Sequence, residues 1–174
     1  MRILEHRRHS RRDPDSPHLN PAGIALARQL GPGLGSFDRV VTSPKPRAVE
    51  TAQALGRSVD AELPELGTMP REVGLVHDRA GLRSFGDYAR ALEQHATLRD
   101  FAAAQAALYV RELERVPDGG RLLLISHGGL IELGAVAAYP AARAWGGPLG
   151  YLEGVRLMRD GPRWGRGEVL RVEG

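Results

Sequence analysis

The sequence predicts an α/β fold, a single domain built around a central and mostly parallel sheet. Short apolar runs alternate along the chain with longer stretches in which apolar residues recur at helical spacing. Strands joined by helices return to the same sheet through right-handed crossovers, so this alternation favours parallel pairing. A chain of 174 residues, 42% of them hydrophobic, is long and apolar enough for one core, and we expect residues 1–174 to form one domain.

The first strand and the first helix are marked by the residues at their ends. Residues 2–6 predict a strand, and residues 7–18 form a polar loop with two prolines. Asn20 and Pro21 start a helix, because asparagine is a good N-cap and proline suits the first helical position. Apolar residues then follow at helical spacing as far as Gly31, which ends the helix.

The middle of the chain predicts another strand and helix and then loses its regularity. Val40-Val41 is a second short strand, and a helix from about Arg47 to Leu55 is stopped by Gly56. Residues 60–84 are rich in glycine and proline and show no clear period, so we expect an irregular loop there.

The last ninety residues predict helix, strand, helix and hairpin. Residues 85–115 are helical in pattern, with alanine-rich turns. The run Leu122–Ile125 is continuously apolar between two glycine pairs, as expected for a strand that is buried on both faces. A helix should follow from Leu130 to about Ala138, and a hairpin should pair residues 152–158 with residues 168–172.

Charge and composition exclude several classes of function. The net charge is only +3 although the pI is about 9.8, and acidic residues are scattered among the arginines, so we expect no nucleic-acid partner. No stretch reaches the roughly 18 apolar residues that span a bilayer, so we expect no membrane partner. Glu5 and His6 interrupt the apolar start, which argues against a secretory signal. Cysteine is absent, which excludes disulfides and suits a cytoplasmic protein.

Arginine and histidine side chains follow three of the predicted strands. Arg8 and His9 come just after the first strand, Arg47 lies in the segment after the second, and His127 follows the strand Leu122–Ile125. In open parallel sheets, ligands bind outside the carboxyl ends of the strands. We therefore expect these four side chains to line one crevice.

Such a set of side chains suits phosphoryl transfer. The reaction needs an in-line nucleophile, cations on the phosphoryl oxygens and a proton for the leaving oxygen. A neutral imidazole can attack phosphorus and form a phosphohistidine, and each planar arginine fork can hold two phosphate oxygens. The sequence has neither a P-loop nor the spacing of histidines and carboxylates that marks a metal site, so we expect no metal and no cofactor.

Three segments, in their order and spacing, resemble the histidine phosphatase superfamily, also called phosphoglycerate mutase-like. They are Arg8-His9-Ser10, Ser43-Pro44-Lys45-Pro46-Arg47-Ala48-Val49-Glu50-Thr51-Ala52, and Ser126-His127-Gly128-Gly129. The resemblance covers most of residues 1–138 and implies a three-layer α/β/α arrangement. It implies that His9 is the nucleophile and that Arg8 and Arg47 hold the phosphate. It also implies that His127 binds the phosphoryl group and stabilises the charge of the transition state.

The resemblance further implies a glutamate in a Leu-x-Glu context as the general acid. Glu65, in Leu63-Pro64-Glu65, matches this spacing, and Glu72 is its competitor. Ser10 stands where the family has glycine, and we expect its small hydroxyl to fit and to donate to phosphate. The first strand carries polar residues where the family is apolar, so we expect it to be short or near an edge of the sheet.

We expect a phosphoric monoester hydrolase that works without a metal through a phosphohistidine. The long insertions of cofactor-dependent mutases are absent, which favours a phosphatase over a mutase. Two alternatives stay open: a phosphate-binding regulatory protein with little turnover, and a phosphoglycerate-mutase-type isomerase. The expected partner is a small phosphorylated substrate, with sugar or acid phosphates, nucleotides and phosphoproteins all open.

Overall fold

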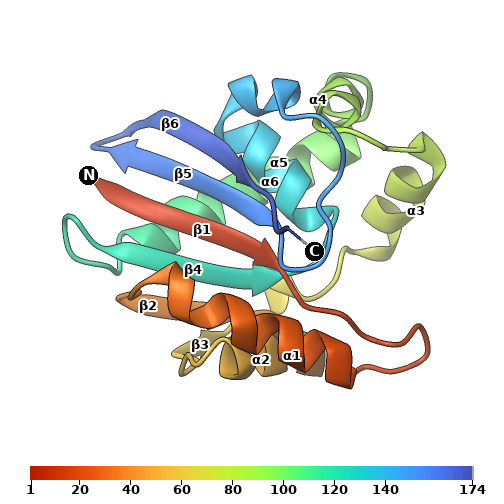
Figure 1. Ribbon diagram of the computed structural model, residues 1–174. Helices are drawn as coiled ribbons and strands as arrows, with labels where there is room; N and C mark the ends of the chain where they lie inside the picture. The colour runs from red at the N-terminus through yellow and green to blue at the C-terminus, as the bar shows by residue number, and fades with distance from the viewer. Residues whose placement is uncertain (174) are drawn as a thin grey trace.

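The computed structural model describes residues 1–173, so that Gly174, the end of the expected domain, lies outside it. One six-stranded sheet has the order β3-β2-β4-β1-β5-β6 (Figure 1). The first four strands in this order pair in parallel, and β5 and β6 continue the sheet in antiparallel pairing. The strands are β1 (Arg2–Arg8), β2 (Arg39–Thr42), β3 (Ala61–Glu62), β4 (Arg121–Ser126), β5 (Gly154–Asp160) and β6 (Arg163–Leu170).

Helices cover both faces of the sheet. Figure 1 shows α1 and α2 against one face and α4, α5 and α6 against the other, with α3 packed on α5. This confirms the expected three-layer α/β/α arrangement around a mostly parallel sheet. The helices are α1 (Pro21–Leu30), α2 (Pro46–Ala54), α3 (Arg71–Ala80), α4 (Phe85–Gln94), α5 (Ala96–Leu113) and α6 (Leu130–Ala138), with short 3-10 helices η1 (Gly31–Leu34), η2 (Pro64–Leu66) and η3 (Pro140–Ala144).

Strand β4 is buried on both faces, as its continuous apolar run predicts. Leu122 and Leu124 pack with Tyr109 of α5 on one side. Leu123 and Ile125 pack on the other side, in the cluster formed with α1 and α2. All four side chains are fully buried, and each burial stabilises the fold by about 1.5–3 kcal/mol.

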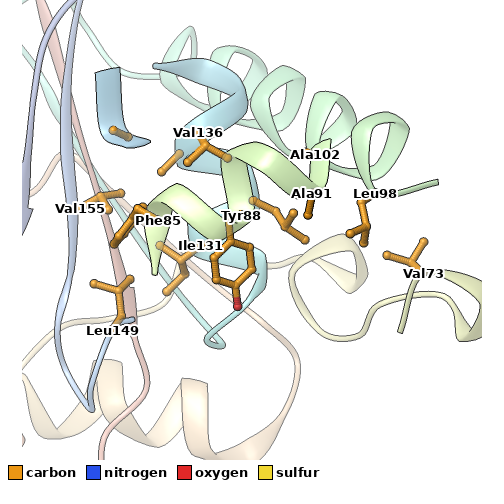
Figure 2. Packing of buried hydrophobic residues seen from close by; sticks show 13 residues of the cluster. Val73, Phe85, Tyr88, Ala91, Leu98, Ala102, Ile131, Val136, Leu149 and Val155 are labelled. Carbon is orange, nitrogen blue, oxygen red and sulfur yellow. The ribbon is translucent and has the colours of Figure 1, made fainter. Parts of the chain in front are cut away.

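A third apolar cluster lies between helices α4, α5 and α6 and strand β5 (Figure 2). Phe85 and Tyr88 of α4, Leu98 of α5 and Ile131 of α6 meet Val155 of β5 in this cluster. The ring of Tyr88 belongs to the cluster, whereas Figure 2 shows its hydroxyl oxygen pointing away from the other labelled side chains. The cluster therefore fixes the ring and leaves the hydroxyl group at its border.

Strand β1 is central in the sheet, so the expectation of a short or edge strand was wrong. It lies between β4 and β5, and its polar residue Glu5 is fully buried. The carboxylate of Glu5 accepts hydrogen bonds from Arg7, from Arg121 of β4 and from Arg156 of β5. Burial alone would raise the pKa of Glu5, but the three arginines outweigh it and lower the pKa. Neighbouring strands thus supply the charges that a buried glutamate needs.

The other polar residue of this strand, His6, is also fully buried. Its Nδ1 lies 2.7 Å from Tyr109 Oη, and its Nε2 lies 2.6 Å from Ser126 Oγ. Burial lowers the pKa of His6 to about 3. The ring is therefore neutral, with both nitrogens hydrogen-bonded.

The segment 60–84 is not the expected irregular loop, because it contains β3, η2 and α3. The period of α3 was hard to read since Gly74 and the exposed Leu75 interrupt it after the buried Val73. The helical stretch 85–115 divides into α4 and α5 at His95, whose backbone is extended. The predicted hairpin at the end of the chain is formed by β5 and β6.

Across residues 1–173, no helix combines the length and the apolar character that crossing a membrane requires.

Candidate active site

The carboxyl ends of β1, β2 and β4 lie together, and the expected site residues follow them. The backbone N–H of His9 donates to the carbonyl of Ser126 at 2.9 Å, and that of Ser43 donates to the carbonyl of Ile125 at 2.9 Å. A cavity of about 320 Å³ opens at this point. Its walls include Arg8, His9, Arg47 and His127. The structure therefore brings these four residues into one crevice.

His9 is held as a neutral imidazole whose lone pair is on Nε2. Its Nδ1 lies 2.7 Å from the carbonyl oxygen of Ser10, which can only accept, so Nδ1 carries the proton. Arg47 Nε can only donate, and it lies 3.2 Å from His9 Nε2. Both contacts assign the same tautomer, which leaves the lone pair of the ring on Nε2.

The surroundings of His9 also keep it unprotonated. Burial, together with the charges of Arg47, Arg8 and Arg12, lowers the pKa of His9 to about 4, although the hydrogen bond to Ser10 acts in the opposite direction. Only 4% of the residue is exposed. At neutral pH, the ring of His9 is therefore unprotonated.

Arg47 reaches His9 because it is the second residue of α2, just after Pro46. The backbone N–H groups of this helix end are already occupied: Arg47 donates to the carbonyl of Pro17 at 3.1 Å, and Ala48 to that of Lys45 at 2.9 Å. The guanidinium group, rather than the helix terminus, is therefore what α2 offers to an anion.

His127 lies beside His9, with the centres of the two rings 5.3 Å apart. Its Nε2 is 2.8 Å from Ser43 Oγ, and burial, with nearby cations led by Arg47, holds its pKa far below the ordinary value. Among residues 1–173, His127 Nδ1 and Arg8 Nε are buried without a hydrogen-bond partner. A buried unpaired polar atom costs about 1–3 kcal/mol. An oxyanion that paired with these atoms would remove that cost.

Arg8 and the two glycines after His127 shape the same cavity. Arg8 Nη1 donates to the carbonyl of Leu149 at 2.8 Å, which orients the guanidinium group. A Cβ atom at Gly128 would lie 3.5 Å from Arg8 Nε. Gly129 has φ +88, which side chains rarely adopt, and a Cβ atom there would lie 3.0 Å from His77 Nε2. The glycine pair thus lets the backbone pass between Arg8 and His77.

Ser10 does not face the cavity, so its expected role in phosphate binding was wrong. Its hydroxyl donates to the carbonyl of Gly23 in α1 at 2.7 Å, and its backbone N–H donates to Thr51 Oγ1 at 3.0 Å. Thr51 in turn donates to the carbonyl of Arg47. Ser10 therefore joins the segment of His9 to α1 and α2.

Neither candidate for the general acid lines the cavity within the described chain. Glu65 is on η2, and its half-exposed carboxylate pairs with Arg111 of α5 at 3.3 Å. Glu72 is exposed in the first turn of α3. The Leu-x-Glu spacing therefore identified a glutamate that pairs with Arg111 and does not line the cavity.

Two further residues of the cavity wall, Arg12 and Glu132, fix the surrounding loops. Arg12 Nη1 donates to three carbonyls of its own loop. Glu132 is only 1% exposed, and its two carboxylate oxygens accept from the N–H groups of Gly129 at 2.7 Å and Leu149 at 3.0 Å. A glutamate three residues after a helix N-cap fits a capping box, which was the available signal for Glu132.

The remaining wall is formed by His77 of α3 and Tyr88 of α4. His77 Nε2 lies 3.1 Å from Tyr88 Oη, and His77 Nδ1 lies 3.2 Å from Asp78 Oδ1. Nothing in the sequence pattern signalled this pair, since His77 belongs to the segment without a clear period.

The buried histidines lead to a first prediction, a loss of stability in acid. The pKa is lowered to about 3 for His6 and to about 4 for His9, and it is lowered for His127 too, whereas an unfolded histidine titrates near about 6.5. Below that pH, the unfolded chain binds protons that the folded chain does not. The free energy of unfolding should therefore fall as the pH falls from about 6.5 towards 4.

Each group contributes a slope of up to about 1.4 kcal/mol per pH unit. Urea unfolding between neutral pH and about pH 4 measures this slope, and His9→Gln should show a shallower one. A free energy of unfolding that stays constant over this range would contradict the assignment of neutral buried imidazoles.

A family model described as histidine phosphatase superfamily (branch 1) matches residues 4–164. The matched range contains every segment that lines the cavity. No protein with a curated description matches the chain in sequence.

Solved structures share the fold. Phosphoserine phosphatase from Entamoeba histolytica, in complex with 3-phosphoglyceric acid, is 17% identical at a TM-score of 0.67, and 91% of each chain is covered. Phosphoglycerate mutase from Bacillus anthracis str. Sterne is 19% identical at a TM-score of 0.65, over 98% of this chain and 92% of that one. Mycobacterial glucosyl-3-phosphoglycerate phosphatase, in complex with VO3, is 22% identical at a TM-score of 0.66, over 99% and 100%.

Proposed function

The chain belongs to the histidine phosphatase superfamily, and on this premise we propose that it is a metal-independent phosphatase that acts through a phosphohistidine on His9. One observation carries the proposal: the neutral imidazole of His9 presents its Nε2 lone pair 3.2 Å from the guanidinium group of Arg47. A phosphoryl group bound at this point meets its nucleophile and a cation together. That juxtaposition is what an in-line phosphoryl transfer needs.

The reaction has two displacements at phosphorus. In the first, His9 Nε2 forms a bond to phosphorus while the ester P–O bond breaks, and the alcohol leaves with a proton. In the second, water attacks phosphorus, the P–N bond breaks, and inorganic phosphate leaves a neutral imidazole behind. Arg8, Arg47 and His127 hold the phosphoryl oxygens, over which the charge of the transition state is spread.

The substrate that we propose is a small phosphorylated molecule. The cavity of about 320 Å³ is near the lower end of small-molecule sites, which measure about 300–1,000 Å³. Its walls carry three cations, Arg8, Arg12 and Arg47, against one carboxylate, Glu132, which favours an anion. The names of the neighbouring structures mention phosphoserine, phosphoglycerate and glucosyl-3-phosphoglycerate, all of which are small phosphate esters.

A phosphate-release screen over a broad panel of phosphomonoesters, with 4-nitrophenyl phosphate as the general probe, tests this function. We expect release that a chelator leaves intact and that vanadate inhibits. Activity that disappears with the chelator and returns with a divalent metal would contradict the metal-independent reaction. Tight phosphate binding without turnover of any ester would favour a regulatory protein instead.

A further inference from the structure

The leaving group needs a proton that the carboxylates of the site do not supply. An alkoxide is a poor leaving group unless an acid protonates it during the reaction. The carboxylate of Glu65 pairs with Arg111 away from the cavity. Glu132 lines the cavity, but backbone N–H groups occupy both of its oxygens. Within residues 1–173, no carboxyl group of the cavity wall is therefore placed to act as the acid.

We propose that Tyr88 and His77 form the proton donor, a relay in which Tyr88 donates to the leaving oxygen and His77 donates to Tyr88. The relay rests on the phosphatase function proposed above. Both side chains line the same cavity as His9. The 3.1 Å contact between His77 Nε2 and Tyr88 Oη is the link along which the proton moves.

Contacts with neighbouring residues hold both rings in position. The carboxylate of Asp78 lies 3.2 Å from His77 Nδ1 and accepts its proton in a hydrogen bond, which orients the ring with Nε2 towards Tyr88. The relay requires His77 to enter the reaction protonated, with Nε2–H donated to Tyr88. The ring of His77 also lies against the backbone of Gly129, at the start of α6. The ring of Tyr88 is fixed in the apolar cluster, and its hydroxyl points away from that cluster (Figure 2).

Tyr88 needs a partner to donate effectively. Burial, reinforced by the negative charge of Glu132, raises the pKa of Tyr88 above its ordinary value, although Arg8 acts in the opposite direction. A tyrosinate left behind in this site would therefore be costly. A proton that arrives from His77 as the hydroxyl proton leaves avoids that intermediate.

The protons that Tyr88 and His77 give up in the first step are replaced in the second. When the ester P–O bond breaks, the leaving oxygen takes the proton of Tyr88, Tyr88 takes that of His77 Nε2, and His77 becomes neutral. When water attacks the phosphohistidine, one water proton passes to Tyr88 and the Tyr88 proton passes to His77. Phosphate then leaves, His9 regains its lone pair, and His77 is an imidazolium again.

The dependence of rate on the leaving group tests the relay. The variants are His77→Asn and Tyr88→Phe, and the probes are 4-nitrophenyl phosphate, phenyl phosphate and glycerol phosphate. Nitrophenolate leaves with little help, whereas an alkoxide needs the proton. We expect kcat/KM to fall by about 10²–10⁴ on glycerol phosphate and by less than about 10 on nitrophenyl phosphate, in both variants.

Two matched substitutions complete the experiment. His95→Asn removes an imidazole at the junction of α4 and α5, outside the cavity, and should leave all three rates unchanged. Glu65→Gln should show no selective loss on the alkyl ester. A selective loss in Glu65→Gln, with the relay variants near normal, would overturn the relay and give the role to Glu65.

An equal loss of kcat/KM on all three esters would indicate a structural role for His77 and Tyr88, whereas a loss confined to glycerol phosphate indicates a chemical one. If His77→Asn and Tyr88→Phe slow all three esters by the same factor, the contact between His77 and Tyr88 has only a structural role and the relay is wrong. Labelling of His9 by nitrophenyl phosphate in these variants would show that the proposed phosphatase function survives that outcome. A wild-type protein that turns over none of the esters would overturn both proposals.

Discussion

Replacing His9 by alanine should abolish turnover, with kcat reduced by a factor on the order of 10⁴–10⁶, as for the loss of a covalent nucleophile. The variant lacks His9 Nε2, the nitrogen that Arg47 Nε contacts at 3.2 Å, and water would have to attack the ester directly. The arginines remain, so phosphate and vanadate should still bind. Steady-state phosphate release from 4-nitrophenyl phosphate measures the loss, and vanadate titration measures the binding.

His95→Ala is the matched control for this change, because it also removes one imidazole but lies outside the cavity. Circular dichroism and thermal unfolding establish that both variants are folded. A folded His9→Ala protein that keeps a substantial fraction of the wild-type rate would show that His9 is not the nucleophile.

Replacing Arg47 by alanine should have the next largest effect. Removing one preorganised donor to developing charge costs about 2.7–4 kcal/mol, which is about 10²–10³ in kcat. Vanadate binding should weaken with the rate, because in the proposed mechanism Arg47 holds the oxygens of vanadate and of the transferred phosphoryl group alike. The neutral imidazole of His9 also loses its contact at Nε2, so its pKa should rise when this charge is removed.

Arg47→Lys and Arg28→Ala are the controls for Arg47. Lysine keeps the charge without the planar fork, so it should recover part of the lost binding. Arg28 is exposed in the last turn of α1, and its removal changes the net charge equally without touching the cavity. Unchanged vanadate affinity in Arg47→Ala would mean that the guanidinium group does not hold the phosphoryl group.

The four residues that the structure brings together were predictable from the sequence for a simple reason. His9, Arg47 and His127 each follow a strand, and the carboxyl ends of parallel strands meet at one edge of a sheet. The strands themselves could be read because β4 is a continuous apolar run that is buried on both faces. The residue pattern alone was enough to predict a strand or helix wherever its apolar residues recur with the period of that element.

Side-chain direction was not predictable, because contacts distant in sequence decide it. Spacing pointed to Glu65 as the acid, but the carboxylate of Glu65 pairs with Arg111 of α5. Ser10 follows His9 directly, yet its hydroxyl turns to the carbonyl of Gly23.

Contacts between residues distant in sequence also determine the rest of the site, which could not be predicted for that reason. His77 and Tyr88 come from α3 and α4, and the packing of α3 on α5 and of α4 on α5 and α6 brings them to the cavity. The central position of β1 was missed as well, because its buried Glu5 is paired by arginines that include residues of β4 and β5.

Location of the covalent intermediate tests the central claim most directly. The wild-type protein is mixed with 4-nitrophenyl phosphate carrying a labelled phosphoryl group and quenched with alkali within one turnover, and the peptides are mapped by mass spectrometry. The expected result is acid-labile phosphate on His9, absent when His9→Ala is treated in the same way. Label on a serine or an aspartate, or on His127 in place of His9, would contradict the account.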